Sequence, residues 1–152
     1  MKRFATFALL AALLVAVIPI TCFAESADEQ TVITYFDDGS YIDEKISVVQ
    51  SRASGTTSGT KDATYYGSGG SAEWKATLTG TFTYTGSSAT CTASSISVTI
   101  YDSDWYTSSK SASKSGNSAN GSVTMGKKLL GVTVSTVSKD VTLKCDANGN
   151  LS

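Results

Sequence analysis

The feature that most constrains the fold is a strict two-residue alternation between Trp74 and Gly86, in the segment WKATLTGTFTYTG. One set of alternate positions is almost entirely threonine, and the other set is mainly apolar. A strand sorts successive side chains onto opposite faces, whereas a helix would scatter the threonines around its circumference. The segment therefore predicts a long strand with a wettable threonine face and an apolar core face. Gly80, in the middle of the core face, indicates a bend or the close approach of another side chain.

The same period recurs along the chain, and no segment beyond residue 24 has the apolar spacing of a helix. The expected strands are 31–36 and 41–50 around a hairpin loop with Gly39 at positive φ, 62–67, 74–86, 87–102 with a bulge near Ser94 and Ser95, 105–116 and 117–126 as a polar pair, 129–138, and 140–145. Residues 51–61 are expected to form a flexible connection. About eight or nine short strands without helices predict an all-β fold, an antiparallel β-sandwich of immunoglobulin-like architecture.

The first 24 residues have the pattern of a signal peptide. Lys2 and Arg3 precede an apolar run over 4–20, and cleavage is expected between Ala24 and Glu25. A retained membrane span is the alternative, but an acidic and polar segment follows the run. The expected organisation is therefore a signal peptide, 1–24, and a single secreted domain, 25–152.

Composition excludes several kinds of function. After loss of Lys2 and Arg3 the chain keeps 10 basic and 13 acidic residues, a net charge of 10 − 13 = −3, so a nucleic-acid partner is not expected. The chain has no histidine, which excludes Ser-His-Asp and Cys-His sites and the usual zinc hydrolases. We expect no metal and no cofactor; the tail DANGN has the opening ligand spacing of a calcium loop but ends before the closing acid.

Carboxylate chemistry survives these exclusions. A two-carboxylate glycoside hydrolase would draw on residues in predicted turns and strands, namely Asp37, Asp38, Asp43, Glu44, Asp102 and Asp104. Acids are ordinary in turns, so the sequence favours a protein that is not an enzyme.

Cys91 and Cys145 are the two cysteines of the exported part. An even count in an oxidising compartment predicts a disulfide between them. Two separate buried thiols are the alternative. Neither cysteine is expected to be a nucleophile, because the chain offers no histidine as a base.

The candidate ligand-binding residues are Asp102, Asp104, Trp105 and Tyr106, in the segment YDSDWY. A ring of Trp105 or Tyr106 can stack on a sugar while the aspartates accept hydrogen bonds from its hydroxyls. In the alternative, the aspartates cap a turn and Trp105 enters the core. The alternation in SKSASKS, 109–115, predicts an edge hairpin whose lysines deter further strand addition.

The segments TYFDDGSYI, WKATLTGTFTYTGSSATC, SVTIYDSDWY, SKSASKSGN and LKCDANGNLS resemble small secreted proteins of Gram-positive, clostridial-type bacteria. That resemblance supports export and the disulfide and implies no catalytic residues. The serine-rich half is more faintly similar to bacteriocins of the lactococcin 972 type. The leading hypothesis is a secreted, non-enzymatic module that binds a glycan or a protein at a cell surface or in the medium; an antagonistic, bacteriocin-like protein is the alternative.

Overall fold

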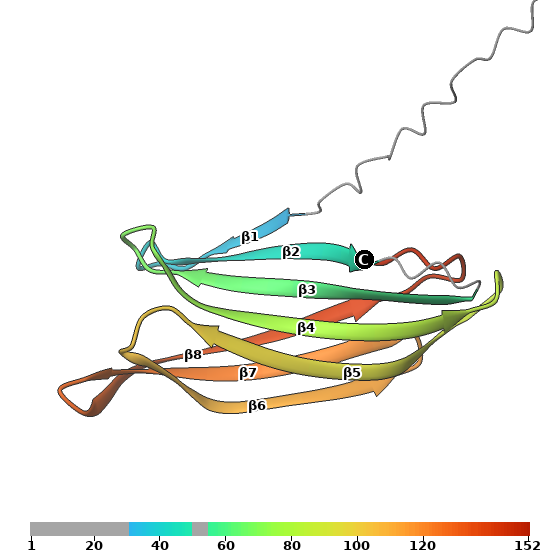
Figure 1. Cartoon of the computed structure of the whole chain (residues 1–152). Coiled ribbons are helices and arrows are strands. Elements are labelled where there is room, and N and C mark those ends of the chain that lie inside the picture. Colours follow the sequence, from blue (N-terminus) through green and yellow to red (C-terminus); the bar gives the residue numbers. More distant parts are fainter. Residues whose placement is uncertain (1–30, 50–54) are drawn as a thin grey trace, which may run out of the picture.

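The structure, a computed structural model, describes residues 31–49 and 55–152. Eight strands make up this part of the chain: β1 (Thr31–Tyr35), β2 (Tyr41–Val49), β3 (Thr56–Tyr66), β4 (Ala72–Tyr84), β5 (Ala89–Ile100), β6 (Trp105–Ser115), β7 (Ser118–Leu129) and β8 (Val132–Lys144). They form two antiparallel sheets, one of five strands in the order β1-β2-β3-β4-β5 and one of three in the order β6-β7-β8 (Figure 1). The all-β prediction is confirmed for these residues.

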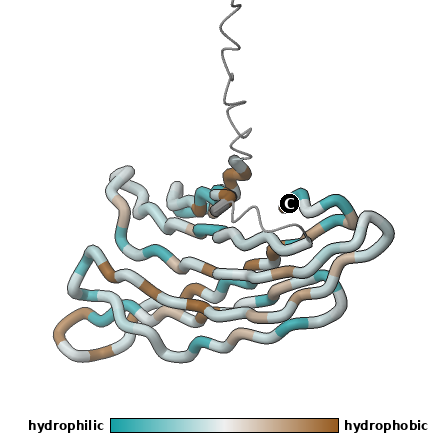
Figure 2. Tube along the Cα trace, turned by 45° about the vertical axis from the view of Figure 1, so that its right-hand side comes forward, coloured by the Kyte–Doolittle hydropathy of each residue, from teal (hydrophilic) through white to brown (hydrophobic). Residues whose placement is uncertain are grey.

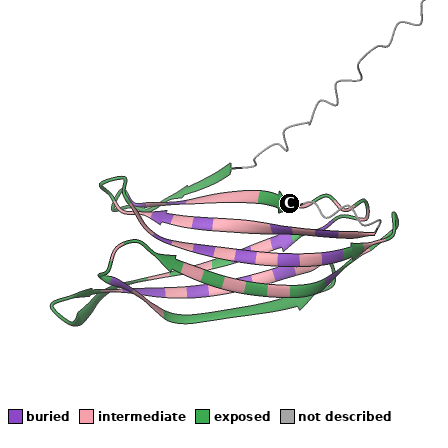
Figure 3. Ribbon diagram, viewed as in Figure 1, coloured by how far each residue is buried: buried purple, intermediate pink, exposed green. Residues whose placement is uncertain are grey.

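The two sheets lie one over the other and share one buried cluster (Figure 1). Large side chains in it include Trp74, Leu78 and Phe82 of β4 in the larger sheet, and Met125 of β7 and Leu143 of β8 in the smaller sheet. Buried and half-buried residues alternate along most of β4 and β7, whereas the outer strands β1 and β6 are mostly exposed (Figure 3). Burial of apolar surface between the sheets is therefore the main stabilising contribution.

Every described strand pairs with its neighbour in the sequence within each sheet. Immunoglobulin domains use Greek-key connections, in which strands adjacent in the chain are separated in the sheet. The observed order of two successive meanders therefore differs from the immunoglobulin order, although both arrangements place two antiparallel sheets around one core.

The segment that most constrained the fold behaves as predicted. Trp74, Leu78 and Phe82 of β4 are 0% exposed, while the threonines alternate with them toward the other face. A Cβ on Gly80 would lie 2.7 Å from the ring of Phe82, so this glycine marks the predicted close approach. The hairpin around Gly39, whose φ is +82°, is also confirmed.

Three local predictions are wrong. Residues 56–61 are not a loose connection but half of β3, where Ser58 pairs with Thr81 of β4; residues 50–54 lie outside the described part. The two strands expected over 129–138 and 140–145 are one strand, β8, because the turn falls at Leu130 and Gly131. The bulge expected near Ser94 lies at Thr92, between the pairs Thr81↔Ala93 and Phe82↔Cys91.

An ion-pair cluster joins the sheets beside the apolar core. Lys139 Nζ of β8 lies 2.9 Å from Glu44 Oε2 of β2, and Lys61 Nζ of β3 lies 3.8 Å from Glu44 Oε1. The side chains of Lys139 and Glu44 are 19% and 12% exposed. One carboxylate thus balances two largely buried cations.

Candidate functional site

The two aspartates of the predicted site shape the loop between β5 and β6. Asp102 Oδ1 accepts a hydrogen bond from the backbone N–H of Asp104 (2.9 Å), and Asp102 Oδ2 lies 3.5 Å from Lys127 Nζ. The carbonyl of Asp104 accepts from the N–H of Lys128 (2.8 Å), which ties the loop to β7. This is the turn-capping arrangement that the sequence offered as the alternative to ligand binding.

Trp105 belongs to the core. Trp105 is only 4% exposed, and its indole Nε1–H donates a hydrogen bond to Glu73 Oε2 at 2.6 Å. Its ring meets the rings of Tyr65 and Trp74 edge to face, with centroids 5.2 and 6.2 Å away. The hypothesis that Trp105 stacks on a sugar is therefore wrong for this structure, because the indole has no free face.

Lys127 completes a small charged cluster under the same loop. Burial lowers the pKa of Lys127, but the hydrogen bond and charge of Glu73, together with Asp102, raise it more, so the net shift is upward. Lys127 Nζ is 3.3 Å from Glu73 Oε1. The loop that carries Asp102 is thus pinned between β4 and β7 instead of being left free to close on a ligand.

Tyr106 is the aromatic side chain of the predicted site that reaches the surface. It lies on the outer face of the smaller sheet, where its ring covers Gly126 of β7; a Cβ on Gly126 would lie 2.5 Å from Tyr106 Cζ. The Tyr106 hydroxyl is 2.9 Å from Thr133 Oγ1. Lys128 Nζ lies 4.6 Å from the ring centroid, a cation–π contact at an exposed position.

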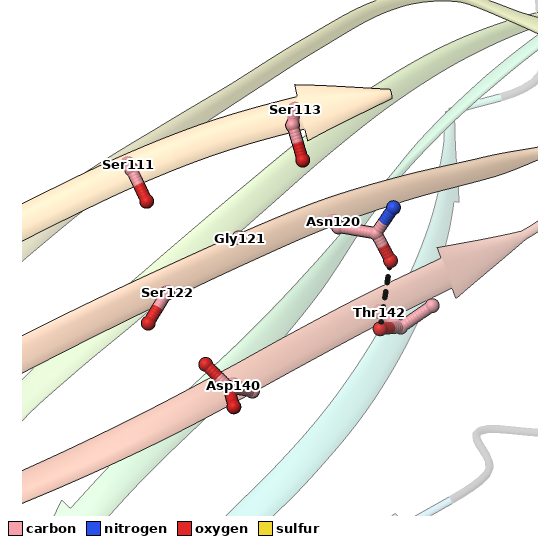
Figure 4. Close-up of a pocket in the computed structure, with 7 residues that line it drawn as sticks. All are labelled: Ser111, Ser113, Asn120, Gly121, Ser122, Asp140 and Thr142. Carbon is pink, nitrogen blue, oxygen red and sulfur yellow. Dashed lines mark hydrogen bonds between the residues drawn. The ribbon is translucent and has the colours of Figure 1, made fainter. Parts of the chain in front are cut away.

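A shallow polar trough of about 290 Å³ lies further along this same face (Figure 4). Its lining comes from all three strands of the smaller sheet: Ser111, Ser113, Asn120, Gly121, Ser122, Asp140 and Thr142. The strand register brings them together, since Ser111, Ser122 and Asp140 share one cross-strand row and Ser113, Asn120 and Thr142 share the next. Thr142 Oγ1 donates to Asn120 Oδ1 at 3.1 Å (Figure 4).

The polar trough is rich in groups that both donate and accept hydrogen bonds. Serine hydroxyls do both, the Asn120 amide carries two donors and an acceptor, and the Asp140 carboxylate accepts. Within the described ranges, no lysine or arginine pairs with Asp140. The trough therefore suits a ligand covered with hydroxyl groups.

One row separates the polar trough from Tyr106. It holds Ser109, Thr124 and Ser138, and the Thr124 and Ser138 hydroxyls lie 3.1 Å apart. Because alternate residues of a strand are about 7 Å apart, the row of Ser122 lies about 13 Å from Gly126, under the Tyr106 ring. Ring and hydroxyls thus form one continuous strip along the outer face of β6, β7 and β8.

Sequence reasoning found Tyr106 but missed the polar trough. The alternation of Ser109, Ser111 and Ser113 predicts only an edge hairpin, and β6 is an edge strand of the smaller sheet. These serines are distinguished by their register with Asn120 and Asp140. That register depends on the pairing of three strands, which puts Ser111 and Asp140 in one row although they are 140 − 111 = 29 positions apart in the sequence. The available signal was the run of polar residues at alternate positions in three successive strands.

Cys91 and Cys145 are both buried, and they are separate thiols in this structure, so the predicted disulfide is not present here. Cys91 Sγ donates to the carbonyl of Ala93 (3.2 Å) and Cys145 Sγ to that of Asp146 (3.3 Å). Burial raises the pKa of both thiols, and the charge of Asp146 adds to the effect at Cys145. Raised pKa values oppose thiolate formation, so neither cysteine is set up as a nucleophile.

In the described residues no group of three or more Asp, Glu or Cys side chains is arranged to hold a metal ion. Asp146, in the tail that has calcium-loop spacing, instead accepts hydrogen bonds from Asn148 and Asn150 of its own turn. Among the residues the structure covers, no helix is long and apolar enough to cross a membrane.

Comparisons with models of known protein families, with curated proteins and with solved structures find no match for this chain. The outer face of the smaller sheet, with the Tyr106 ring and the polar trough, therefore provides the evidence for function.

Proposed function

We propose that this chain is a secreted, non-enzymatic module that binds a glycan along the outer face of β6, β7 and β8. The observation that carries the proposal is the position of the Tyr106 ring over Gly126, on the same face as the polar trough. An aromatic ring offers an apolar surface to the C–H face of a sugar, while hydroxyl, amide and carboxylate groups hydrogen-bond to its hydroxyls. The strip supplies both kinds of contact in line, as an extended oligosaccharide requires.

Lys128 lies over the Tyr106 ring, so a stacked sugar has to displace it. Exposed cation–π contacts contribute only about 0.5–1 kcal/mol, and Lys128 is an exposed, flexible side chain. The displaced ammonium group stays close enough to donate hydrogen bonds to a ligand hydroxyl. Lys128 is therefore compatible with stacking and adds a donor at this end of the strip.

Export and the finer fold belong to the same proposal. Residues 1–24 direct secretion with cleavage between Ala24 and Glu25, and the two sheets close as a β-sandwich. Cys91 and Cys145 form the disulfide once an external oxidant accepts their two electrons and two protons. Their backbone N–H groups support this pairing, since they bond to the carbonyls of the adjacent residues Gly116 (2.8 Å) and Asn117 (3.0 Å).

The test is a glycan array probed with residues 25–152, which contain all eight strands. We expect wild type to bind at least one class of glycan and Tyr106→Ala to lose that signal. Tyr35→Ala is the matched control, because Tyr35 is a 71% exposed tyrosine on the other sheet. An empty array for wild type, or equal signals for wild type and Tyr106→Ala, contradicts the proposal.

A further inference from the structure

The hairpin between β7 and β8 ends in an apolar tip formed by Leu129, Leu130, Val132 and Val134. These side chains are 60%, 97%, 66% and 56% exposed, respectively. The hairpin projects from one end of the smaller sheet (Figure 1), and its end is largely coloured as hydrophobic in Figure 2. A cluster of large apolar side chains at a projecting point is typical of an interaction surface.

Leu130 has an unfavourable backbone conformation at this tip. Its φ is +53°, and the next residue, Gly131, has a φ of +83°. This two-residue turn, with both φ angles positive, normally holds Asn or Gly first, because a β-carbon is disfavoured in the left-handed region. The leucine side chain gains no packing in return, since it is 97% exposed. Folding of the single chain therefore gives no reason for leucine at this position.

We propose that the apolar tip inserts into the interfacial layer of a lipid bilayer that contains anionic lipids. The tip is convex, so it suits a soft apolar layer. Backbone polar groups in an apolar layer need hydrogen-bond partners within the protein. The hairpin meets this requirement, because Leu129 pairs with Val132 and the strands are paired up to the turn. This inference does not rest on glycan binding, although Lys128 and Tyr106 adjoin both the apolar tip and the glycan strip.

Lys128 supplies charge complementarity directly behind the apolar tip. It is exposed, and in the part of the chain that the structure describes no acidic side chain pairs with it. Its neighbour Lys127, by contrast, is already engaged by Glu73 and Asp102. A lysine at this depth meets the anionic headgroups while the leucines lie among the upper acyl chains. Tyr106, under Lys128, is the type of ring that favours the membrane interface.

A second copy of the chain is a poorer occupant for the apolar tip. A symmetric tip-to-tip contact would bury few side chains, well short of the roughly 1,000 Å² that a specific interface needs. The groove lined by Phe36, Tyr65 and Val137 could accept a leucine, but that contact would join two different surfaces. Such contacts do not close and lead to open-ended assemblies.

The experiment is sedimentation of residues 25–152 with vesicles made of equal parts phosphatidylcholine and phosphatidylglycerol. We expect wild type to pellet with the vesicles and Leu130→Asn to bind at least tenfold more weakly. Asparagine is favoured at a positive φ, so this variant should fold at least as stably as wild type. Val132→Thr, which keeps a β-branched residue in β8, provides a second loss of binding that does not involve the turn.

Lys128→Gln should weaken binding about fivefold, since one lysine near an anionic surface contributes about 1 kcal/mol. Lys144→Gln is its matched control, because Lys144 is exposed at the opposite end of β8 and should not change binding. No pelleting of wild type, or equal pelleting of Leu130→Asn, would overturn the proposal. The proposal would also be overturned if wild type formed assemblies in vesicle-free buffer and Leu130→Asn abolished them. The apolar tip would then dock on a second copy of the chain.

Discussion

The ring of Tyr106 lies directly over Gly126, so close that a β-carbon on the glycine would be 2.5 Å from Tyr106 Cζ. Because Gly126 has no side chain, the Tyr106 ring can lie directly against the sheet. The ring thus has one face against the backbone of β7 and its other face toward Lys128 and solvent. This contact prepares an aromatic surface at one end of the polar trough.

Gly126→Ala should therefore displace Tyr106 and abolish glycan binding. Forcing a methyl group against the ring is expected to lower the free energy of unfolding by about 1–2 kcal/mol, a typical cost of overpacking. Urea denaturation and the glycan array measure the two effects. Gly69→Ala is the matched control, because a Cβ there meets nothing within 4 Å and should leave both unchanged. Full glycan binding by Gly126→Ala would show that the position of the ring is irrelevant.

Trp105 should matter for stability and not for direct ligand contact. Trp105→Ala removes a large buried ring and is expected to lower the free energy of unfolding by about 3–5 kcal/mol. Glu73→Ala should cost about 2–3 kcal/mol, because it leaves Trp105 Nε1 and Lys127 without their acceptor. Chemical denaturation checks both values. If Trp105→Ala kept wild-type stability but lost glycan binding, Trp105 would be a ligand contact after all.

The ion-pair cluster between the sheets should contribute more to stability than the more exposed pair of Lys75 and Asp62. Glu44→Gln leaves Lys139 and Lys61 without their shared carboxylate and should cost about 2 kcal/mol, somewhat below the usual range for a fully buried pair. Lys75→Met breaks the pair with Asp62, whose side chains are 31% and 28% exposed, and should cost less than about 1 kcal/mol. Equal losses in urea denaturation would contradict the difference in burial.

The two thiols predict how stability depends on pH in the reduced protein. Burial raises the pKa of Cys91 and Cys145 in the folded state, so the unfolded chain loses these protons first as the pH rises. The two thiols thus make their full contribution to the free energy of unfolding below the pKa of an unfolded cysteine, about 8.5. This contribution is lost as the pH rises from there toward the pKa values of the folded state. The urea midpoint with a reductant present should fall above about pH 8.5.

The double variant Cys91→Ala and Cys145→Ala is the control for this effect, and so is the oxidised protein, since neither carries a titrating thiol. Both should lose less stability than the reduced wild type over the same pH interval. A parallel decline in all three samples would assign the pH dependence to other groups. Mass spectrometry of protein recovered from culture medium checks the proposed disulfide itself, which predicts a mass two hydrogens below that of the dithiol form.

Local alternation was sufficient to predict most of the fold. It placed β4 and its core face correctly, because one sheet face is buried and period two fixes which side chains face inward. It failed at 56–61, where serine, threonine and glycine resemble a linker in sequence but Ser58 and Gly59 pair with β4 in the structure. It also divided β8 between residues 138 and 140, although Lys139 continues the strand and pairs with Glu44 of β2.

The candidate site was harder to predict for a related reason. Tyr106 could be selected from its sequence neighbourhood, but nothing local distinguished it from Trp105, which the same motif places on the opposite face of β6. Asp140 and Asn120 acquire their meaning only from the register of β6, β7 and β8. Register over three strands is a tertiary property, so the place of Asn120 and Asp140 in the site could not be predicted from the sequence.

Glycan binding along the outer face of β6, β7 and β8 is tested by a nuclear magnetic resonance titration of ¹⁵N-labelled residues 25–152 with the oligosaccharide that binds best on the array. We expect saturable shifts of the backbone amides of four residues on one face of the smaller sheet, Tyr106, Ser111, Ser122 and Asp140. Shifts confined to the outer face of the larger sheet, around Tyr35 and Thr77, would contradict it.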